Sequence, residues 1–320
     1  MLLVSKLLYH KKLRKVVSHY FRFLRIIRSA VSAYKREMSY FLRAKWSLSH
    51  EVENKALLLR KRAHFAERVL ITPDAYTLEI AERVTKELDV QIRKADGEAP
   101  TSQIEWAKKI LNELRKSSGS RSKCAKLDTC TKSAPPTMST DSLMKLIKNR
   151  RSRRVFTQVP LSQAERLLIT EAALNVPSCC NRQPLELIFV EERGLKSLIA
   201  DTIPGGRQFF YNAPCILILI ADGRDYNYPE DRVNPYAEAG AAIQNIYLLC
   251  ETIGLGCCWG SYNSFGSVRS EYKVRQKLKI PESYIIVGSV ALGRSTQSIC
   301  SIPRNPIQSC YHIDYWSCKS

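Results

Sequence analysis

Long uncharged apolar runs and the usual spacings of metal ligands are both missing from this sequence. No stretch approaches the roughly 18 apolar residues of a membrane-spanning helix, so none is predicted. There is no Cys-x-x-Cys pair and no His-Glu-x-x-His, and only five of the 320 residues are histidines. These absences argue against a zinc site, and we expect no bound metal.

The opening residues lack the features of a secretory signal peptide. Their apolar start is interrupted by Lys6, a basic run follows, and no small-residue cleavage site is present. The eleven cysteines are odd in number and include two adjacent pairs, Cys179–Cys180 and Cys257–Cys258. A disulfide framework is therefore not favoured, and we expect reduced thiols in a cytoplasmic chain. Whether the adjacent pairs are redox-active stays open.

Acidic residues are almost absent from the first 45 positions. Twelve Lys and Arg stand there against one acid, Glu37, which gives +11 of the chain's net +20. Apolar residues recur every three or four positions from Leu13 to Phe41, which predicts a helix with one apolar seam. A basic helix within a helical bundle is the favoured interpretation. Contact with an anionic membrane surface, at the inner membrane face, comes second and nucleic acid last.

Composition divides the chain into three parts. Residues 1–116 are predicted to be a basic helical region, with further helices over 51–70, 74–94 and 101–116. Residues 117–138 are rich in Ser, Thr, Lys and Pro and show no apolar period, which is typical of a linker. Residues 139–320 are predicted to form a second domain with its own core.

The second domain shows both helical and strand patterns. After a short helix over 139–149, Ser162 and Glu165 form a capping box, which predicts a helix that ends near Asn175. A longer buried helix is expected from about Tyr236. Nearly continuous apolar runs are typical of strands covered on both faces, and they occur at 185–192, 215–222 and 284–293. We therefore expect an α+β domain.

An arginine-rich run, RRSRRVF, occupies residues 150–156. This charge alone fits a nucleic-acid-binding patch, a nuclear localisation signal or a pocket for a compact dianion. A loop bounded by Pro177 and Pro184 follows at a helix-to-strand junction, where Ser178 and Asn181 can direct short polar groups at a planar ligand.

In order and spacing, these segments resemble the nitroreductase family of FMN-dependent oxidoreductases over residues 143–310. The arginine run and the Pro-Ser-x-x-Asn-x-Gln-Pro loop carry the resemblance first. Three later segments extend it, and they are Ala213-Pro214 before a strand, Gln244-Asn245 in a helix that leads to a glycine-containing turn, and Pro303-Arg304 before Pro306.

The resemblance implies a fold and an activity. The fold is a homodimer with a central, mostly antiparallel sheet flanked by helices, here preceded by an all-helical region. The activity is ping-pong hydride transfer from NAD(P)H through FMN to a small organic acceptor such as a nitroaromatic, quinone or enone. Two alternatives stay open. One is a membrane- or nucleic-acid-attached binding protein with a flavin fold as its dimerising scaffold, and the other is a related flavin dehalogenase or biosynthetic oxidase.

The resemblance also implies site residues. Arg150, Ser152 and Arg304 would hold the FMN phosphate or ribityl side, and Arg151 and Arg154 would lie near the pyrimidine edge or the phosphate. The backbone of Cys258, Trp259 or Gly260 would lie near flavin N5 in the catalytic turn. Residues of the proline-bounded loop would reach the FMN of the other subunit, namely Pro177, Ser178, Cys179, Asn181 and Gln183.

Overall fold

The computed structural model describes residues 54–71, 75–117, 137–203, 206–224, 226, 229–260, 268–298 and 302–314, with scattered helical positions between 20 and 42. Among the helices in these ranges, none combines the length and apolarity that crossing a bilayer requires. Most of the predicted linker lies outside the described residues, and so do Leu13, Val17 and Phe41 of the predicted apolar seam.

An antiparallel sheet forms the centre of the C-terminal part, with strand order β1-β2-β4-β3. The strands are β1 (Leu185–Val190), β2 (Cys215–Asp222), β3 (Gly256–Gly260) and β4 (Tyr284–Gly293). Three of them occupy the positions that the apolar runs predicted. The segment 256–260 differs, because the sequence predicted a turn there and the structure has an edge strand paired with β4.

Side-chain alternation along β2 divides the interior into two cores. All eight of its residues are buried, as expected for a strand covered on both faces. Cys215, Leu217 and Leu219 point into one core, whereas Ile216 and Ile218 point into the other. Successive strand residues point to opposite faces, so one continuous apolar run supplies both cores.

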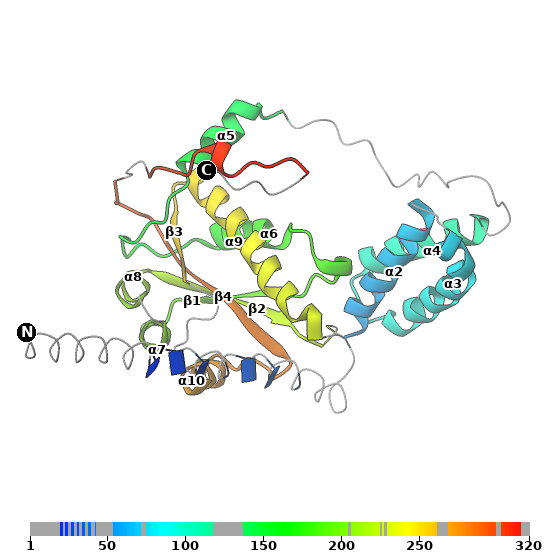
Figure 1. Cartoon of the computed structure of the whole chain (residues 1–320). Coiled ribbons are helices and arrows are strands. Elements are labelled where there is room, and N and C mark those ends of the chain that lie inside the picture. The colour runs from blue at the N-terminus through cyan, green and yellow to red at the C-terminus, as the bar shows by residue number, and fades with distance from the viewer. Residues whose placement is uncertain are drawn as a thin grey trace, which may run out of the picture.

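Helices cover both faces of the sheet (Figure 1). The first core contains residues of α6 and α9, and the second contains residues of α7, α8 and α10. Their bounds are α6 (Gln163–Leu174), α7 (Arg193–Thr202), α8 (Arg207–Asn212), α9 (Asn234–Thr252) and α10 (Val268–Leu278). The predicted α+β architecture is confirmed.

Local capping fixes the ends of the helices around the arginine run. The side chain of Ser139 caps α5 (Thr140–Asn149). The predicted capping box is present at α6, where Ser162 Oγ accepts from the Glu165 N–H at 3.2 Å and Glu165 Oε2 accepts from the Ser162 N–H at 2.7 Å. Beyond α9, Gly254 has a φ of +72°, a conformation that glycine adopts without strain.

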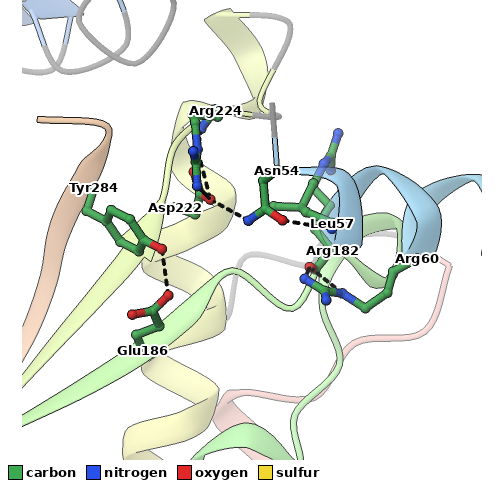
Figure 2. A network of polar contacts seen from close by, with 8 residues as sticks. All are labelled: Asn54, Leu57, Arg60, Arg182, Glu186, Asp222, Arg224 and Tyr284. Atoms are coloured by element: carbon green, nitrogen blue, oxygen red, sulfur yellow. Dashed lines mark hydrogen bonds and ion pairs between the residues drawn. The ribbon is translucent and has the colours of Figure 1, made fainter. Parts of the chain in front are cut away.

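The N-terminal helices α2 (Lys55–Ile71), α3 (Ala75–Ala95) and α4 (Thr101–Ser117) share a separate apolar core. They lie to one side of the sheet in Figure 1. Polar contacts join α2 to the sheet domain, as Figure 2 shows. Asn54 Nδ2 donates to Asp222 Oδ2 at 2.9 Å at the end of β2, and Arg60 donates to the main-chain oxygen of Arg182.

Candidate active site

The arginine run lies outside the helices, and its side chains alternate between two environments, as those of an extended segment do. Arg150, Ser152 and Arg154 line one pocket. Arg153 faces away, where its guanidinium pairs with Glu251 at 3.3 Å and donates to the Gln297 main-chain oxygen at 2.7 Å. Arg151 donates to main-chain oxygens at the end of α5. The run therefore supplies pocket groups from every second residue, as an extended backbone requires.

The pocket measures about 550 Å³ and has three walls. One wall is the arginine run, the second is α9, and the third is the edge strand β3. The α9 residues are spaced as one helix face requires. Besides the three residues of the run, the lining residues are Gly240, Ile243, Gln244, Tyr247, Cys258 and Trp259.

Positive charge dominates the wall made by the run. Among the described residues, no carboxylate pairs with the guanidinium of Arg150 or Arg154, in contrast to Arg153. Arg150 Cζ instead lies 4.8 Å from the Tyr247 ring centroid, and Arg154 Cζ lies 5.9 Å from that of Phe209. Aromatic stacking orients a guanidinium without neutralising it, so both side chains keep their charge for an anion in the pocket.

Tyr247 connects all three walls. Its hydroxyl accepts a hydrogen bond from the Trp259 backbone N–H at 2.7 Å, and it lies 3.2 Å from Ser152 Oγ. Burial raises the pKa of this phenol to about 12. The hydroxyl therefore stays protonated at neutral pH and can donate to Ser152 while it accepts from Trp259.

The strand β3 presents alternate backbone groups to the arginine run and α9. The Cys257 main-chain oxygen accepts from the Arg153 N–H at 2.9 Å, and the Trp259 N–H is held by Tyr247. Successive residues of a strand direct their backbone groups to opposite sides. The N–H groups of Cys258 and Gly260 therefore point toward β4. Burial raises the pKa of the Cys258 thiol, although Arg154 and Ser152 oppose the shift. A buried, protonated thiol is a poor nucleophile.

The proline-bounded loop forms a second group of site residues, apart from this pocket. Ser178 Oγ accepts from the Gln183 N–H at 3.0 Å, and Gln183 Nε2 donates to Asn181 Oδ1 at 2.9 Å. The Cys179 N–H donates to Glu238 Oε1 of α9 at 2.9 Å. Pro177 is exposed at the start of the loop.

A smaller pocket, of about 120 Å³, lies beside the loop. Ser178, Gln183, Arg60 and Glu238 line it together with apolar side chains. Glu238 is 6% exposed, and burial raises its carboxyl pKa despite the opposing Cys179 N–H and Arg182. Its Oε2 atom has no hydrogen-bond partner within the described structure.

The structure thus brings some of the predicted site residues together and separates others. Arg150, Ser152, Arg154, Cys258 and Trp259 line the larger pocket. The loop residues line or adjoin the smaller one, and within a single chain the two groups are distinct. Neither lining includes Arg151, Arg304 or Gly260, and Arg304 is exposed in the C-terminal segment.

Sequence reasoning missed Tyr247 and Gly240 in the larger pocket. The signal was present, because both lie on the same helix face as Gln244, with Gly240 four residues before it and Tyr247 three residues after it. Arg60 was missed for a different reason. Its partner, Arg182, is 122 positions away, and no local pattern indicates such a contact.

Comparison with known proteins identifies a family for the C-terminal part of the chain. The nitroreductase family profile matches residues 147–294. An Archaeoglobus fulgidus protein named "Putative NADH dehydrogenase/NAD(P)H nitroreductase" is 30% identical over 154 residues, which cover 48% of this chain and 85% of that protein. The Bacillus subtilis FMN reductase (NAD(P)H) is 22% identical over 188 residues, or 54% of this chain and 73% of that enzyme.

A solved structure supports the fold. The crystal structure of nitroreductase A from Vibrio parahaemolyticus superimposes with a TM-score of 0.50 at 22% identity. The match covers 57% of this chain and 79% of that one. The profile match begins at residue 147, so the helices α2–α4 are an addition to the matched part.

Proposed function

The chain belongs to the nitroreductase family, and from this premise we propose that it is an FMN-dependent oxidoreductase with NAD(P)H as electron donor. When bound, FMN would accept hydride from the donor and pass it to a small organic acceptor in a ping-pong cycle. Nitroaromatics, quinones, enones and oxidised flavins are the acceptor classes to test. Relatives named as NAD(P)H nitroreductases and FMN reductases support the proposal.

One observation carries the proposal. Arg150 and Arg154 reach the same pocket from alternate positions of one extended segment, and neither has a carboxylate partner among the described residues. A phosphate monoester carries nearly two negative charges and matches guanidinium donors well. Ser152 lies between them and adds a hydroxyl. This donor set fits the anionic end of FMN.

The other walls fit a planar, apolar ring. Ile243 and Trp259 offer apolar surface, and Gln244 can hydrogen-bond to a ring edge. We propose that the backbone of Trp259 lies near the reacting edge, with its N–H held by the Tyr247 hydroxyl, since the N–H groups of Cys258 and Gly260 face β4. Tyr247 fixes its direction. A positive guanidinium near the ring would favour added negative charge there.

We propose a homodimer in which each loop completes the site of the partner. Leu143, Met144 and Ile147 of α5 are about 40% exposed, and no residue of this helix is buried in the single chain. An amphipathic helix with an uncovered apolar face fits a subunit interface. Ser178 and Asn181, which lie outside the larger pocket, would then approach the FMN of the second copy. Such a dimer would bring both residue groups around one cofactor.

The proposal is tested on the purified full-length chain. We expect a yellow protein with a flavin spectrum that NADH or NADPH bleaches without oxygen and that a turnover acceptor restores. A screen of acceptors would define the substrate class, and sedimentation analysis would define the oligomeric state. A colourless chain that takes up no added FMN would contradict the proposal.

A second role, attachment to an anionic membrane surface, is favoured by the N-terminal segment. Tyr20, Phe21 and Phe23 are 59–65% exposed at helical positions, within a part of the sequence that carries a large excess of basic residues. Exposed aromatics beside cations fit an interfacial helix. Full-length chain should sediment with vesicles that contain anionic lipid and stay unbound with neutral ones. Equal binding to both, or to neither, would contradict this role.

A further inference from the structure

The loop from Pro177 to Pro184 has an unfavourable backbone. Cys180, Asn181 and Gln183 all have positive φ, at 54°, 52° and 51°, although none is glycine. Left-handed residues with a side chain cost on the order of 1–3 kcal/mol each and persist only where their surroundings hold them. External contacts must therefore hold this loop in its present shape.

Some of the hydrogen bonds that hold the loop lie within the sheet domain. Glu238 of α9 accepts from the Cys179 N–H, and Ser178 Oγ accepts from the Gln183 N–H. Side-chain packing restrains Ser178 and Gln183 less than these hydrogen bonds do, because the smaller pocket of about 120 Å³ lies against both residues. Side chains beside a void have fewer neighbours to hold them, so hydrogen bonds carry more of the restraint.

A further contact comes from outside the family-matched part of the chain. Arg60 of α2 donates from Nε and Nη2 to the Arg182 main-chain oxygen, at 3.1 and 2.8 Å. Arg182 stands between two of the left-handed residues. Both bonds come from one rigid guanidinium, so they restrain the direction of this carbonyl as well as its position (Figure 2).

Arg60 is itself held in place. Its Nη1 donates to Gln103 Oε1 of α4 at 3.1 Å. Just before the start of α2, Asn54 Nδ2 donates to Asp222, which Arg224 Nη2 also contacts at 2.7 Å. Burial lowers the pKa of Arg60, and the nearby Asp222 carboxylate opposes that shift. Because even partial burial of a charge is costly, a guanidinium used only for packing would be a poor choice at this position.

We infer that Arg60 is a positioning residue for the proposed FMN site, and that the N-terminal helices thereby set the shape of the loop that approaches the partner's cofactor. The inference rests on the proposed function. By this inference, α2–α4 contribute to the active site because they hold the loop through Arg60. A loop that is already held in its bound shape does not lose conformational freedom when the cofactor binds.

Three variants of the full-length chain test the inference. Arg60→Met keeps a long unbranched side chain and removes the charge and the N–H donors. Arg60→Lys restores one donor and the charge. Arg62→Ala is the matched control, since Arg62 pairs with Glu87 within the helical region at 2.7 Å and does not contact the loop.

Two measurements decide the outcome. In the absence of FMN, hydrogen exchange at the Asn181 and Gln183 amides should be at least about tenfold faster in Arg60→Met than in the unaltered chain, because two hydrogen bonds from a charged group to the Arg182 carbonyl are lost. The dissociation constant of FMN should rise by about tenfold for the same reason. Arg60→Lys should lie between the two, Arg62→Ala should match the unaltered chain, and thermal melting of all variants should be similar.

The inference is overturned if Arg60→Met matches Arg62→Ala in both measurements while the unaltered chain binds FMN. A large loss of thermal stability in Arg60→Met alone, without rescue by Arg60→Lys, would also overturn it, because the role would then be structural. If the unaltered chain binds no FMN, the proposed function fails and the cofactor half of the inference fails with it. In that case the hydrogen-exchange comparison still tests the other half of the inference, which is that Arg60 holds the loop.

Discussion

The hydroxyl of Tyr247 in α9 accepts a hydrogen bond from the Trp259 backbone N–H in β3 at 2.7 Å. This bond joins the helix to the side of the edge strand that faces away from β4. The same hydroxyl lies 3.2 Å from Ser152 Oγ. A single side chain therefore sets the relative positions of the strand and the arginine run across the proposed cofactor pocket.

The first prediction concerns Tyr247→Phe. The variant keeps the ring beneath Arg150 but removes the hydroxyl, so the Trp259 N–H and Ser152 Oγ lose a partner. We expect a loss of about 1 kcal/mol in unfolding free energy, faster exchange at the Trp259 amide and weaker FMN binding. Tyr272→Phe is the control, because Tyr272 is 54% exposed on α10. Equal FMN affinities in the two variants would contradict the prediction.

The second prediction concerns the charge of the pocket. Arg150→Ala should weaken FMN binding by about 1.5–3 kcal/mol, the contribution of a charged hydrogen bond, as measured by flavin fluorescence titration. Combination with Arg304→Ala should raise the loss to several kcal/mol if the C-terminal segment also approaches the phosphate. The matched control is Arg207→Ala, which removes the same charge from an exposed pair with Asp201. If Arg207→Ala weakened FMN binding as much as Arg150→Ala does, the effect would come from the overall charge of the protein and not from a contact made by Arg150.

Much of the fold could be predicted because its signals are local. The capping box at Ser162 and Glu165 needs only four residues of sequence, and the buried strand over 215–222 is a continuous apolar run. Strand β3 gave no such signal, since Gly-Cys-Cys-Trp-Gly has no β-branched residue and becomes a strand only by pairing with β4. Tertiary pairing decided its conformation.

The site could be predicted only in part. The resemblance indicated the arginine run, but it did not indicate which arginines share a pocket, because that depends on the extended backbone that turns Arg151 and Arg153 away. The proposed division of the chain at residues 117–138 likewise gave no sign that α2 contacts the loop near Arg182. Such contacts between distant segments arise from folding as a whole.

The third prediction concerns Gly260, the last of the three predicted catalytic residues. A Cβ atom added there would lie 2.6 Å from Phe210 Cζ and 2.7 Å from Ser289 Oγ, and Phe210 is fully buried. We expect Gly260→Ala to destabilise the fold by about 1–3 kcal/mol, as overpacking does. The control is Gly240→Ala, whose Cβ would meet Trp259 at an ordinary 3.6 Å. Its stability should be unchanged or up to about 1 kcal/mol higher, because alanine favours the helix. Thermal or denaturant unfolding checks both, and equal stabilities would contradict the steric explanation.

The last prediction concerns Glu238 and pH. Burial raises the pKa of this carboxyl above its ordinary value of 4.5. Within the window between 4.5 and the raised value, the folded chain keeps a proton that the unfolded chain releases. The protonated carboxyl's contribution to stability is therefore fully present below the window and is lost as the pH rises through it, by at most about 1.4 kcal/mol per pH unit for one proton.

Glu238→Gln tests this linkage. The amide does not titrate, and its oxygen can still accept from the Cys179 N–H, which now bonds to Glu238 Oε1 at 2.9 Å. Arg182 and Tyr226 face the same carboxyl, and they are unchanged in the variant. Relative to the unaltered chain, Glu238→Gln should therefore gain melting temperature as the pH rises through the window, with the smallest difference at the acidic end. Melting curves that stay parallel over this range would show that Glu238 does not keep its proton in the folded chain.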